Sequence, residues 1–495
     1  MTASSVASAP GKCILFGEHS VVYGYPAVAA ALSDLRIYVE AALHADGPFM
    51  EVVLCDLPSA QTGTGGVPVS LCMPFETIRD GMSSSSCGVR TSWWDPSPPP
   101  DLQISALNNL ITFLPELDRS ALVPCLFLCM GLIPQLFEQP HPQQGVRIRV
   151  RSADLPVGAG LGSSAAFSVA LAAALLKLQL EHFPPMPSEE GHLPPQSLRQ
   201  AGSTAIRANT VMAQRSLGAS VACFRPGDSV RSLIDGWAYA AECILHGKPS
   251  GLDNAVACAG DAMRLSKKGG HGALSFEPVE PFPQLHVLLT NTRVPRKTSA
   301  LVARVRALHE ANPRVTTPIF EAMAAIAESF LDLCTAHEAP EGIAKQLDLL
   351  VQMNHKLLAA LQVSAPSLEE VVAIAQADEF NLPTKLTGAG GGGCAFSVLG
   401  TQNLDADTMR RAHKCRQRLE AKGYRCYMTA VGGHGVLWHE GSGCEGGARN
   451  SDVAAFFEPS NGRSRNLQYL EKRRWAAACA AALVAVGVFI AARGR

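Results

Sequence analysis

Apolar and polar positions alternate most clearly just before a glycine-rich turn in the middle of the chain. In 145–151 the alternation is strict, which predicts a half-buried strand. The alanine-rich, mostly apolar run 165–180 predicts a buried helix. Between them, 156–166 combines three glycines with small residues and two serines. We therefore expect a strand, a glycine loop and a helix in direct succession.

The rest of the chain shows the same mixture of patterns, which favours an α+β class. A glycine cluster within 385–399 stands between two strand-like flanks, where a mere linker would be unusual, so we expect a second loop that approaches a ligand or another backbone. Helices are predicted at 102–117, 237–246, 298–310, 318–333 and 343–361, with a further start near 250. Strands are predicted at 286–292, 425–430 and 435–439.

Residues 59–101 differ from their surroundings in composition. They contain four consecutive serines at 83–86 and a proline-rich stretch at 96–100. This turn-forming chemistry predicts a surface insertion that is partly disordered. Trp93 and Trp94 lie inside it, and two interpretations stay open for them: a docking patch, or a contact with the host domain.

Composition excludes several functional classes. The chain has 495 residues, 47% of them hydrophobic and 17% charged, which fits a globular protein. A formal net charge of −1 gives no general attraction to nucleic acid. The 15 cysteines show no C-x-x-C spacing for zinc, and residues 1–10 lack a secretory pattern. We therefore expect reduced thiols and a cytoplasmic location.

The C-terminal end forms a separate case. Residues 475–492 carry no charge and are flanked by basic residues at 472–474 and 493–495. As a helix they would span about 27 Å, enough for a thin bilayer. The segment is thus a candidate transmembrane helix, a tail anchor on an organelle membrane such as the peroxisome, with 441–474 as a polar linker. A buried or surface helix and an aberrant gene-model end stay open as alternatives.

The 156–166 segment has the chemistry of a phosphate loop. Glycine allows positive φ and a close backbone approach, and the helix start supplies free N–H groups. The hydroxyls of Ser163 and Ser164 offer ligands to phosphate oxygens or to a magnesium ion. The alternative is a flexible loop with an ordinary serine N-cap. The segment matches neither the Walker loop nor the dinucleotide fingerprint.

Charged residues near the N-terminus bracket a short apolar strand. Lys12 is either a surface lysine or a fixed positive charge that holds a phosphoryl group. Glu18 and His19 follow in a glycine loop, where they belong to a site, to the loop surface or to a structural hydrogen-bond pair.

Two carboxylates in the middle of the chain are further candidates. Glu242 lies on an apolar helix pattern, where burying it unpaired would be costly and a magnesium ion would offset the cost. Asp253 has capping-box spacing with Ser250, and it is equally suited to accept a proton from a substrate hydroxyl.

Together these segments resemble the motifs of the GHMP kinases over 9–439, apart from 59–100. The three family motifs are similar to 9–24, 156–166 and 385–394. Within the family, 17–24, 246–254 and 289–296 resemble the signatures of the mevalonate kinase group.

The resemblance implies a two-domain GHMP kinase fold. A ribosomal-protein-like N-terminal domain with a left-handed βαβ unit would cover 1–275, and a ferredoxin-like C-terminal domain would cover 276–440. It also implies a homodimer.

The resemblance further implies a role for each candidate residue. Asp253 would be the catalytic base, and Lys12 would lie between it and the γ-phosphate of ATP. Ser164 and Glu242 would hold Mg²⁺, and Glu18 and His19 would lie beside the substrate. The predicted ATP contacts are Lys12, Gly158, Ala159, Gly160, Leu161, Gly162, Ser163 and Ser164, with Ser59 and Ala153 at positions that depart from the pattern, and the second glycine loop contributes Gly388, Gly390, Gly391 and Gly392.

The activity implied by the resemblance is ATP-dependent phosphorylation of the 5-hydroxyl of (R)-mevalonate to 5-phosphomevalonate, a precursor of isoprenoids and sterols. Two alternatives stay open: another small-molecule GHMP kinase, and a catalytically silent sensor or scaffold with the same fold.

Overall fold

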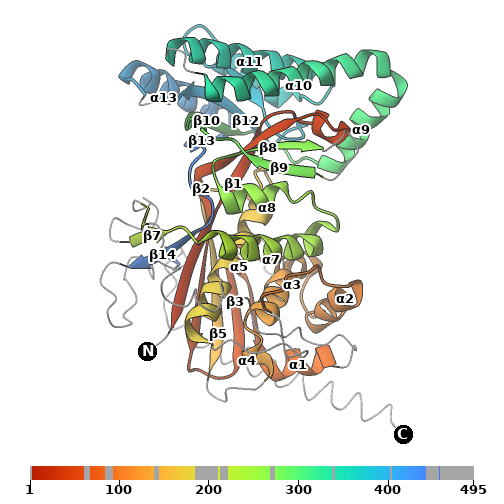
Figure 1. Ribbon diagram of the computed structural model, residues 1–495, viewed down its shortest axis with the longest axis vertical. Coiled ribbons are helices and arrows are strands. Elements are labelled where there is room, and N and C mark those ends of the chain that lie inside the picture. The colour runs from red at the N-terminus through yellow and green to blue at the C-terminus, as the bar shows by residue number, and fades with distance from the viewer. Residues whose placement is uncertain are drawn as a thin grey trace. The chain divides into compact units, whose positions relative to one another are not determined.

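A fourteen-stranded sheet runs through the residues that the structure describes. The computed structural model describes residues 3–60, 67–83, 93–138, 144–183, 210–211, 221–267, 274–336, 340–401, 404–441 and 456–457. Met1–Val453 form one compact unit, and the contacts described below lie within it. Figure 1 colours its elements in chain order.

The first strand lies inside the sheet. β1 (Ser4–Phe16) is antiparallel to both of its neighbours, β2 (Ala27–His44) and β14 (Leu437–Gly441). β2 pairs with β5 (Gly145–Ala153), and β5 is parallel to β3 (Phe49–Pro58). Buried positions alternate along β5, so the predicted strand is confirmed. The other strands of this part are β4 (Pro68–Pro74), β6 (Thr210–Val211), β7 (Val221–Phe224), β8 (Ala262–Lys267) and β9 (Leu274–Pro278).

The central helix is α5 (Ser163–His182), which packs on β1 and β2 and contacts α3, α7 and α8. It is buried on nearly every side, as its apolar sequence predicted. Within the described part of the chain, α5 is also the one helix long and apolar enough to cross a membrane, and 78% of the qualifying window is buried in the protein. The remaining helices here are α1 (Phe75–Ser83), α2 (Asp101–Leu110), α3 (Glu116–Leu132), α4 (Gln135–Glu138), α7 (Asp228–His246) and α8 (Leu252–Ala259), with a 3-10 turn at Ser20–Tyr23.

A second hydrophobic core lies against the C-terminal strands. These strands pair antiparallel, and the last of them meets β2 where Val431 is opposite Leu32. In order they are β11 (Thr384–Leu386), β12 (Cys394–Gly400), β10 (Leu285–Asn291) and β13 (Arg425–Val431). The helices are α9 (Thr298–Ala311), α10 (Pro313–Thr335), α11 (Pro340–Ala360), α12 (Pro366–Ala375) and α13 (Ala406–Ala421), of which α10, α11 and α13 lie together at one end of Figure 1.

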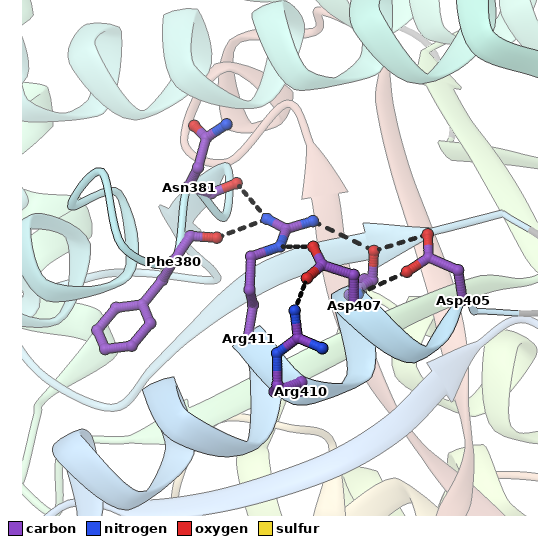
Figure 2. A network of polar contacts seen from close by, with 7 residues as sticks. Phe380, Asn381, Asp405, Asp407, Arg410 and Arg411 are labelled. Atoms are coloured by element: carbon purple, nitrogen blue, oxygen red, sulfur yellow. Dashed lines mark hydrogen bonds and ion pairs between the residues drawn. The ribbon is translucent and has the colours of Figure 1, made fainter.

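A polar network joins α13 to Phe380 and Asn381, which precede β11, as Figure 2 shows. The guanidinium of Arg411 on α13 donates from Nη1 to the carbonyl of Phe380 at 2.6 Å and from Nε to Asp407 at 3.1 Å. Asp405 caps the same helix by accepting from the backbone N–H of Thr408 at 2.7 Å. The turn that leads into β11 is therefore held against α13.

Several predicted boundaries are wrong, although the mixed α+β class is confirmed. The pattern at 102–117 is two helices, because the chain turns before Pro115 and Pro115 itself is the extended N-cap of α3. α10 begins at Pro313 rather than at 318, and α7 begins at Asp228 rather than at 237. Proline is tolerated in a first helical turn, so α10 can begin on one.

The predicted surface loop at 59–101 contains regular structure. β4 extends the sheet beside β3 and buries Val69, Leu71 and Met73. Trp93 is 3% exposed, and its carbonyl accepts a hydrogen bond from Nε1 of Trp237 at 2.8 Å. Trp93 therefore contacts the host core and is not a docking patch; the serine run at 84–86 lies outside the described residues.

We predict that Trp93→Ala lowers the free energy of unfolding by about 3–5 kcal/mol, because it leaves a cavity in the core. Trp94→Ala is the matched control, since this neighbour is only half buried and should cost less than half as much. Urea denaturation followed by circular dichroism measures both. Equal losses for the two variants would contradict the placement of Trp93.

Candidate active site

The predicted phosphate loop joins β5 to α5. Gly158, Gly160 and Gly162 all have positive φ, at 74°, 77° and 69°, and Gly162 is the N-cap of α5. The backbone N–H of Lys12 donates to the carbonyl of Leu161 at 2.7 Å, so β1 is joined directly to this loop. Free N–H groups at the start of α5 make the loop suitable for binding phosphate.

Lys12 and Asp253 form an ion pair, with 3.0 Å between Nζ and Oδ1. Lys12 is 8% exposed, so it is not a surface lysine. The capping-box interpretation of Asp253 is wrong, because the N-cap of α8 is Gly251, and the hydroxyl of Ser250 accepts from the backbone N–H of Leu252 at 3.3 Å rather than from that of Asp253. A Cβ on Gly162 would lie 2.9 Å from Cγ of Lys12, so the phosphate loop passes directly over this pair.

Glu242 is buried at 3% exposure beside the start of α5. Its Oε2 accepts from the hydroxyl of Ser164 at 3.1 Å, and its Oε1 accepts from Ser168 at 3.2 Å. Nε2 of His246 lies 3.2 Å from the Ser164 hydroxyl and 3.6 Å from Oε2. Burial, and to a smaller extent the charge of Asp253, raises the pKa of Glu242 to about 7, although the hydrogen bonds from the two hydroxyls act in the opposite direction. A buried carboxylate beside a hydroxyl is a hard oxygen donor set.

Glu18 and His19 are both buried, so neither belongs to a loop surface. Glu18 forms an ion pair with Lys385 on β11, and both side chains are almost fully buried, at 1% and 0% exposure. Nε2 of His19 lies 2.9 Å from the carbonyl of Ala389 in the second glycine loop. The loop after β1 is thereby attached to the Lys385 segment.

The second glycine loop lies between β11 and β12 and needs its glycines for backbone reasons. Gly388, Gly390, Gly391 and Gly392 all have positive φ. A Cβ on Gly390 would lie 2.1 Å from the carbonyl oxygen of Val363.

Arg296 lies between the two glycine loops. Its guanidinium would be 1.4 Å from a Cβ on Gly160 and 3.1 Å from one on Gly388. Nη1 donates to the carbonyl of Thr387 at 3.4 Å. Burial lowers the pKa of Arg296. The two glycine loops therefore meet around one half-buried cation.

An apolar pocket of about 230 Å³ adjoins the phosphate loop. Ala153 and Ser59 do not line it, whereas their neighbours Ser152 and Leu57 do. The hydroxyl of Ser59 instead donates to Asp118 at 2.5 Å. The lining residues are Ile37, Leu54, Asp56, Leu57, Ser120, Ala121, Val150, Ser152, Val157, Ser163, Ser164, Phe167 and Leu245.

Sequence reasoning missed four side chains that the structure brings to the site: Ser168, His246, Arg296 and Lys385. Ser168 follows Ser164 by four residues and His246 follows Glu242 by four, so helical spacing was a usable signal for both. Arg296 and Lys385 lie within segments that carried the resemblance, but their partners are far away in the sequence, so no local pattern indicated what they contact.

Comparisons with known proteins agree with one another. The model of the family described as GHMP kinases N terminal domain matches residues 128–190. The mevalonate kinase of Mus musculus is 34% identical over 440 residues, which cover 87% of this chain and 94% of the relative. That of Schizosaccharomyces pombe is 32% identical over 437 residues, covering 88% and 92%.

Solved structures share the fold. The L. major mevalonate kinase in complex with R-mevalonate has a TM-score of 0.52 at 18% identity and covers 87% of this chain and 96% of its own. The Methanococcus jannaschii mevalonate kinase has a TM-score of 0.52 at 20% identity, covering 87% and 98%.

We predict that Gly160→Ala is much more destabilising than Gly158→Ala. Both positions have positive φ, so each alanine carries left-handed strain of about 1–2 kcal/mol. At Gly160 the new Cβ meets Arg296, whereas at Gly158 no atom of the described residues lies within 4 Å of it. Chemical denaturation should therefore show a further loss of about 1–3 kcal/mol for Gly160→Ala. Equal stabilities would mean that the guanidinium of Arg296 leaves this space without measurable cost.

Proposed function

The chain belongs to the mevalonate kinase family of GHMP kinases, and we propose that it transfers the γ-phosphoryl group of ATP to the 5-hydroxyl of (R)-mevalonate. The observation that carries the proposal is the 3.0 Å ion pair between Lys12 and Asp253 beneath the phosphate loop. The product is 5-phosphomevalonate, which supplies isoprenoid and sterol synthesis.

Asp253 acts as the base in this proposal. Its carboxylate accepts the hydroxyl proton as the new O–P bond forms and ADP leaves. Lys12 pairs with that carboxylate and places a positive charge beside the transferred group. Asp253 is about one-third exposed, with 35% side-chain exposure, so a substrate hydroxyl can reach it. Phosphoryl transfer depends mainly on positioning and charge stabilisation, which these two groups supply.

GHMP kinases use ATP, and membership of the family extends that use to this chain. We propose that the phosphates of ATP bind along Gly158–Ser164. The adenine ring of ATP would then occupy the apolar pocket lined by Phe167, Leu57 and Val150. The pocket adjoins Ser163 and Ser164, so one nucleotide can bridge both places.

Glu242 and Ser164 fit a magnesium ion. Glu242 is buried without a lysine or arginine partner among the described residues, and its pKa is raised to about 7, so a divalent cation would relieve an unfavourable burial. Magnesium prefers one or two such oxygen ligands together with phosphates and water. When bound, it neutralises charge on the phosphate oxygens.

Two other functions remain distinguishable by assay. Another GHMP kinase would phosphorylate galactose, homoserine or phosphomevalonate, so the purified chain should be tested with each alcohol under one ATP-consumption protocol. A silent scaffold would phosphorylate none. The scaffold is disfavoured because Lys12, Ser164, Glu242 and Asp253 all retain the required chemistry around one loop.

We also propose a cytoplasmic homodimer, which rests on the family resemblance and the residue composition. The candidate anchor at 475–492 lies outside the described residues and stays a prediction.

We predict that Asp253→Asn lowers kcat at least about a hundredfold, the usual contribution of a positioned base. ATP binding, measured by calorimetry, should stay within about twofold because the phosphate loop is unchanged. The control is Asp261→Asn, because Asp261 is an exposed aspartate that follows α8. Near-normal turnover of Asp253→Asn would remove the base from the mechanism.

We predict that Glu242→Gln raises the Mg²⁺ concentration needed for half-maximal activity by at least about tenfold, because a neutral amide is a poorer ligand. Glu181→Gln is the control: this carboxylate lies near the C-terminal end of α5 and pairs with Lys177 at 3.8 Å. A titration of activity against Mg²⁺ measures both. An unchanged Mg²⁺ requirement for Glu242→Gln would exclude it as a ligand.

A further inference from the structure

His246 lies beside both residues proposed to hold Mg²⁺, and the proposed mechanism gives it no role. It is the last residue of α7, and its side chain is 54% exposed. Nε2 of its ring is 3.2 Å from the hydroxyl oxygen of Ser164 and 3.6 Å from Oε2 of Glu242. The longer distance is poor for a hydrogen bond, so the ring nitrogen is directed at the hydroxyl. Because magnesium prefers oxygen ligands, the imidazole is placed to act on the hydroxyl rather than to bind the metal itself.

The single proton of the Ser164 hydroxyl decides the direction of the contact with His246. This proton is donated to Oε2 of Glu242 at 3.1 Å. The hydroxyl oxygen must therefore accept from His246, which carries a proton on Nε2. A serine oxygen has two lone pairs, and this bond occupies one of them. The other lone pair is left for a cation, in a direction that the two hydrogen bonds fix.

Two packed helices carry these groups, α5 with Ser164 and α7 with Glu242 and His246. Glu242 and His246 are four residues apart, so their side chains share one face of α7. The backbone N–H of Gly247 donates to the carbonyl of Cys243 at 2.9 Å, so α7 keeps its helical geometry up to its last residue. The imidazole therefore approaches Ser164 from an ordered helix end rather than from a loop.

We propose that His246 is a positioning residue whose Nε2–H holds the hydroxyl of Ser164 in one orientation and so raises the affinity for the Mg²⁺ that accompanies ATP. A ligand that is already oriented need not be ordered when the cation binds, which is why partners of metal ligands contribute to metal affinity. The inference rests on the proposed function, because it concerns a ligand of the same magnesium ion.

Two variants that differ by one methylene group test the donor. Glutamine places an amide N–H about as far from the backbone as Nε2 of histidine, whereas asparagine reaches only as far as Nδ1. Both are neutral, so any effect of charge at the end of α7 is the same in the two. The measurement is the dissociation constant of a non-hydrolysable ATP analogue, by calorimetry on the full chain, once with Mg²⁺ and once with a chelator. A pH of about 8 keeps Glu242 ionised, because its pKa is about 7.

We expect His246→Asn to weaken binding of the analogue with Mg²⁺ about tenfold, the lower end of what loss of a ligand-orienting partner costs. His246→Gln should stay within about twofold of the unmodified chain, because it restores the donor. With the chelator, all three proteins should bind the analogue within about twofold of one another, since the hydrogen bond acts on a metal ligand. The Mg²⁺ concentration for half-maximal activity should rise in His246→Asn by the same factor as the dissociation constant.

His182→Asn is the matched control for a change at a helix end. His182 is the last residue of α5, and its Nε2 lies 3.8 Å from the carboxylate of Glu181. It is about 27 Å from Ser164 along the helix. Its replacement should leave binding of the analogue unchanged both with Mg²⁺ and with the chelator.

Unchanged binding of the analogue with Mg²⁺ in His246→Asn overturns the proposal. Equal weakening in His246→Gln also overturns it, because the donor would then be irrelevant. So does a loss in His246→Asn that persists with the chelator, which would indicate general damage to the nucleotide site. Failure of the proposed magnesium site is a separate result, because the unmodified chain would then bind the analogue no more tightly with Mg²⁺ than with the chelator.

Discussion

One residue of the first strand, Lys12, contacts both parts of the reaction site, the phosphate loop and Asp253, and fixes their relative positions. The backbone N–H of Lys12 binds the phosphate loop at Leu161, and its side chain binds Asp253 at the start of α8. Lys12 lies opposite Ala31 of β2, and the start of β1 is also paired with β14, at Val6, Ala7 and Ser8. Lys12 therefore has little freedom to follow either partner. The phosphate loop and the carboxylate are therefore placed relative to a strand in the sheet, and only indirectly relative to each other.

The glycines of the two loops are required because other atoms pack closely against the backbone there, rather than because the loops need to be flexible. Around Arg296 the two loops approach so closely that a single added carbon at Gly160 would overlap the guanidinium. At Gly390 the obstacle is the carbonyl oxygen of Val363. These loops are thus constrained by their neighbours, which agrees with a site that is formed before the ligand arrives.

Local features such as strands, helices and glycine loops could be predicted from the sequence, whereas contacts between residues far apart in the chain could not. Strand β5, helix α5 and the glycine loops follow from periodicity and from residue type. The sequence left two roles open for Asp253, a helix-capping residue and a proton acceptor. They could be separated only because the structure shows that Gly251 is the N-cap of α8. Lys385 meets a partner 367 positions earlier, which a single sequence does not reveal. In β4, the alternation of Val69, Leu71 and Met73 was obscured by the serine- and proline-rich composition around it.

The position of β14 bears on when the protein can fold during synthesis. Val6 on β1 pairs with His439, and Trp438 is fully buried with its indole N–H donating to Ala173 on α5 at 3.0 Å. The buried guanidinium of Arg36 likewise donates to the carbonyls of His434 and Gly435. The ribosome must therefore make nearly the whole kinase unit before β1, the first strand to be synthesised, can pair with β14. A nascent chain that stalls earlier carries an open sheet edge and an uncovered core, a natural substrate for chaperones.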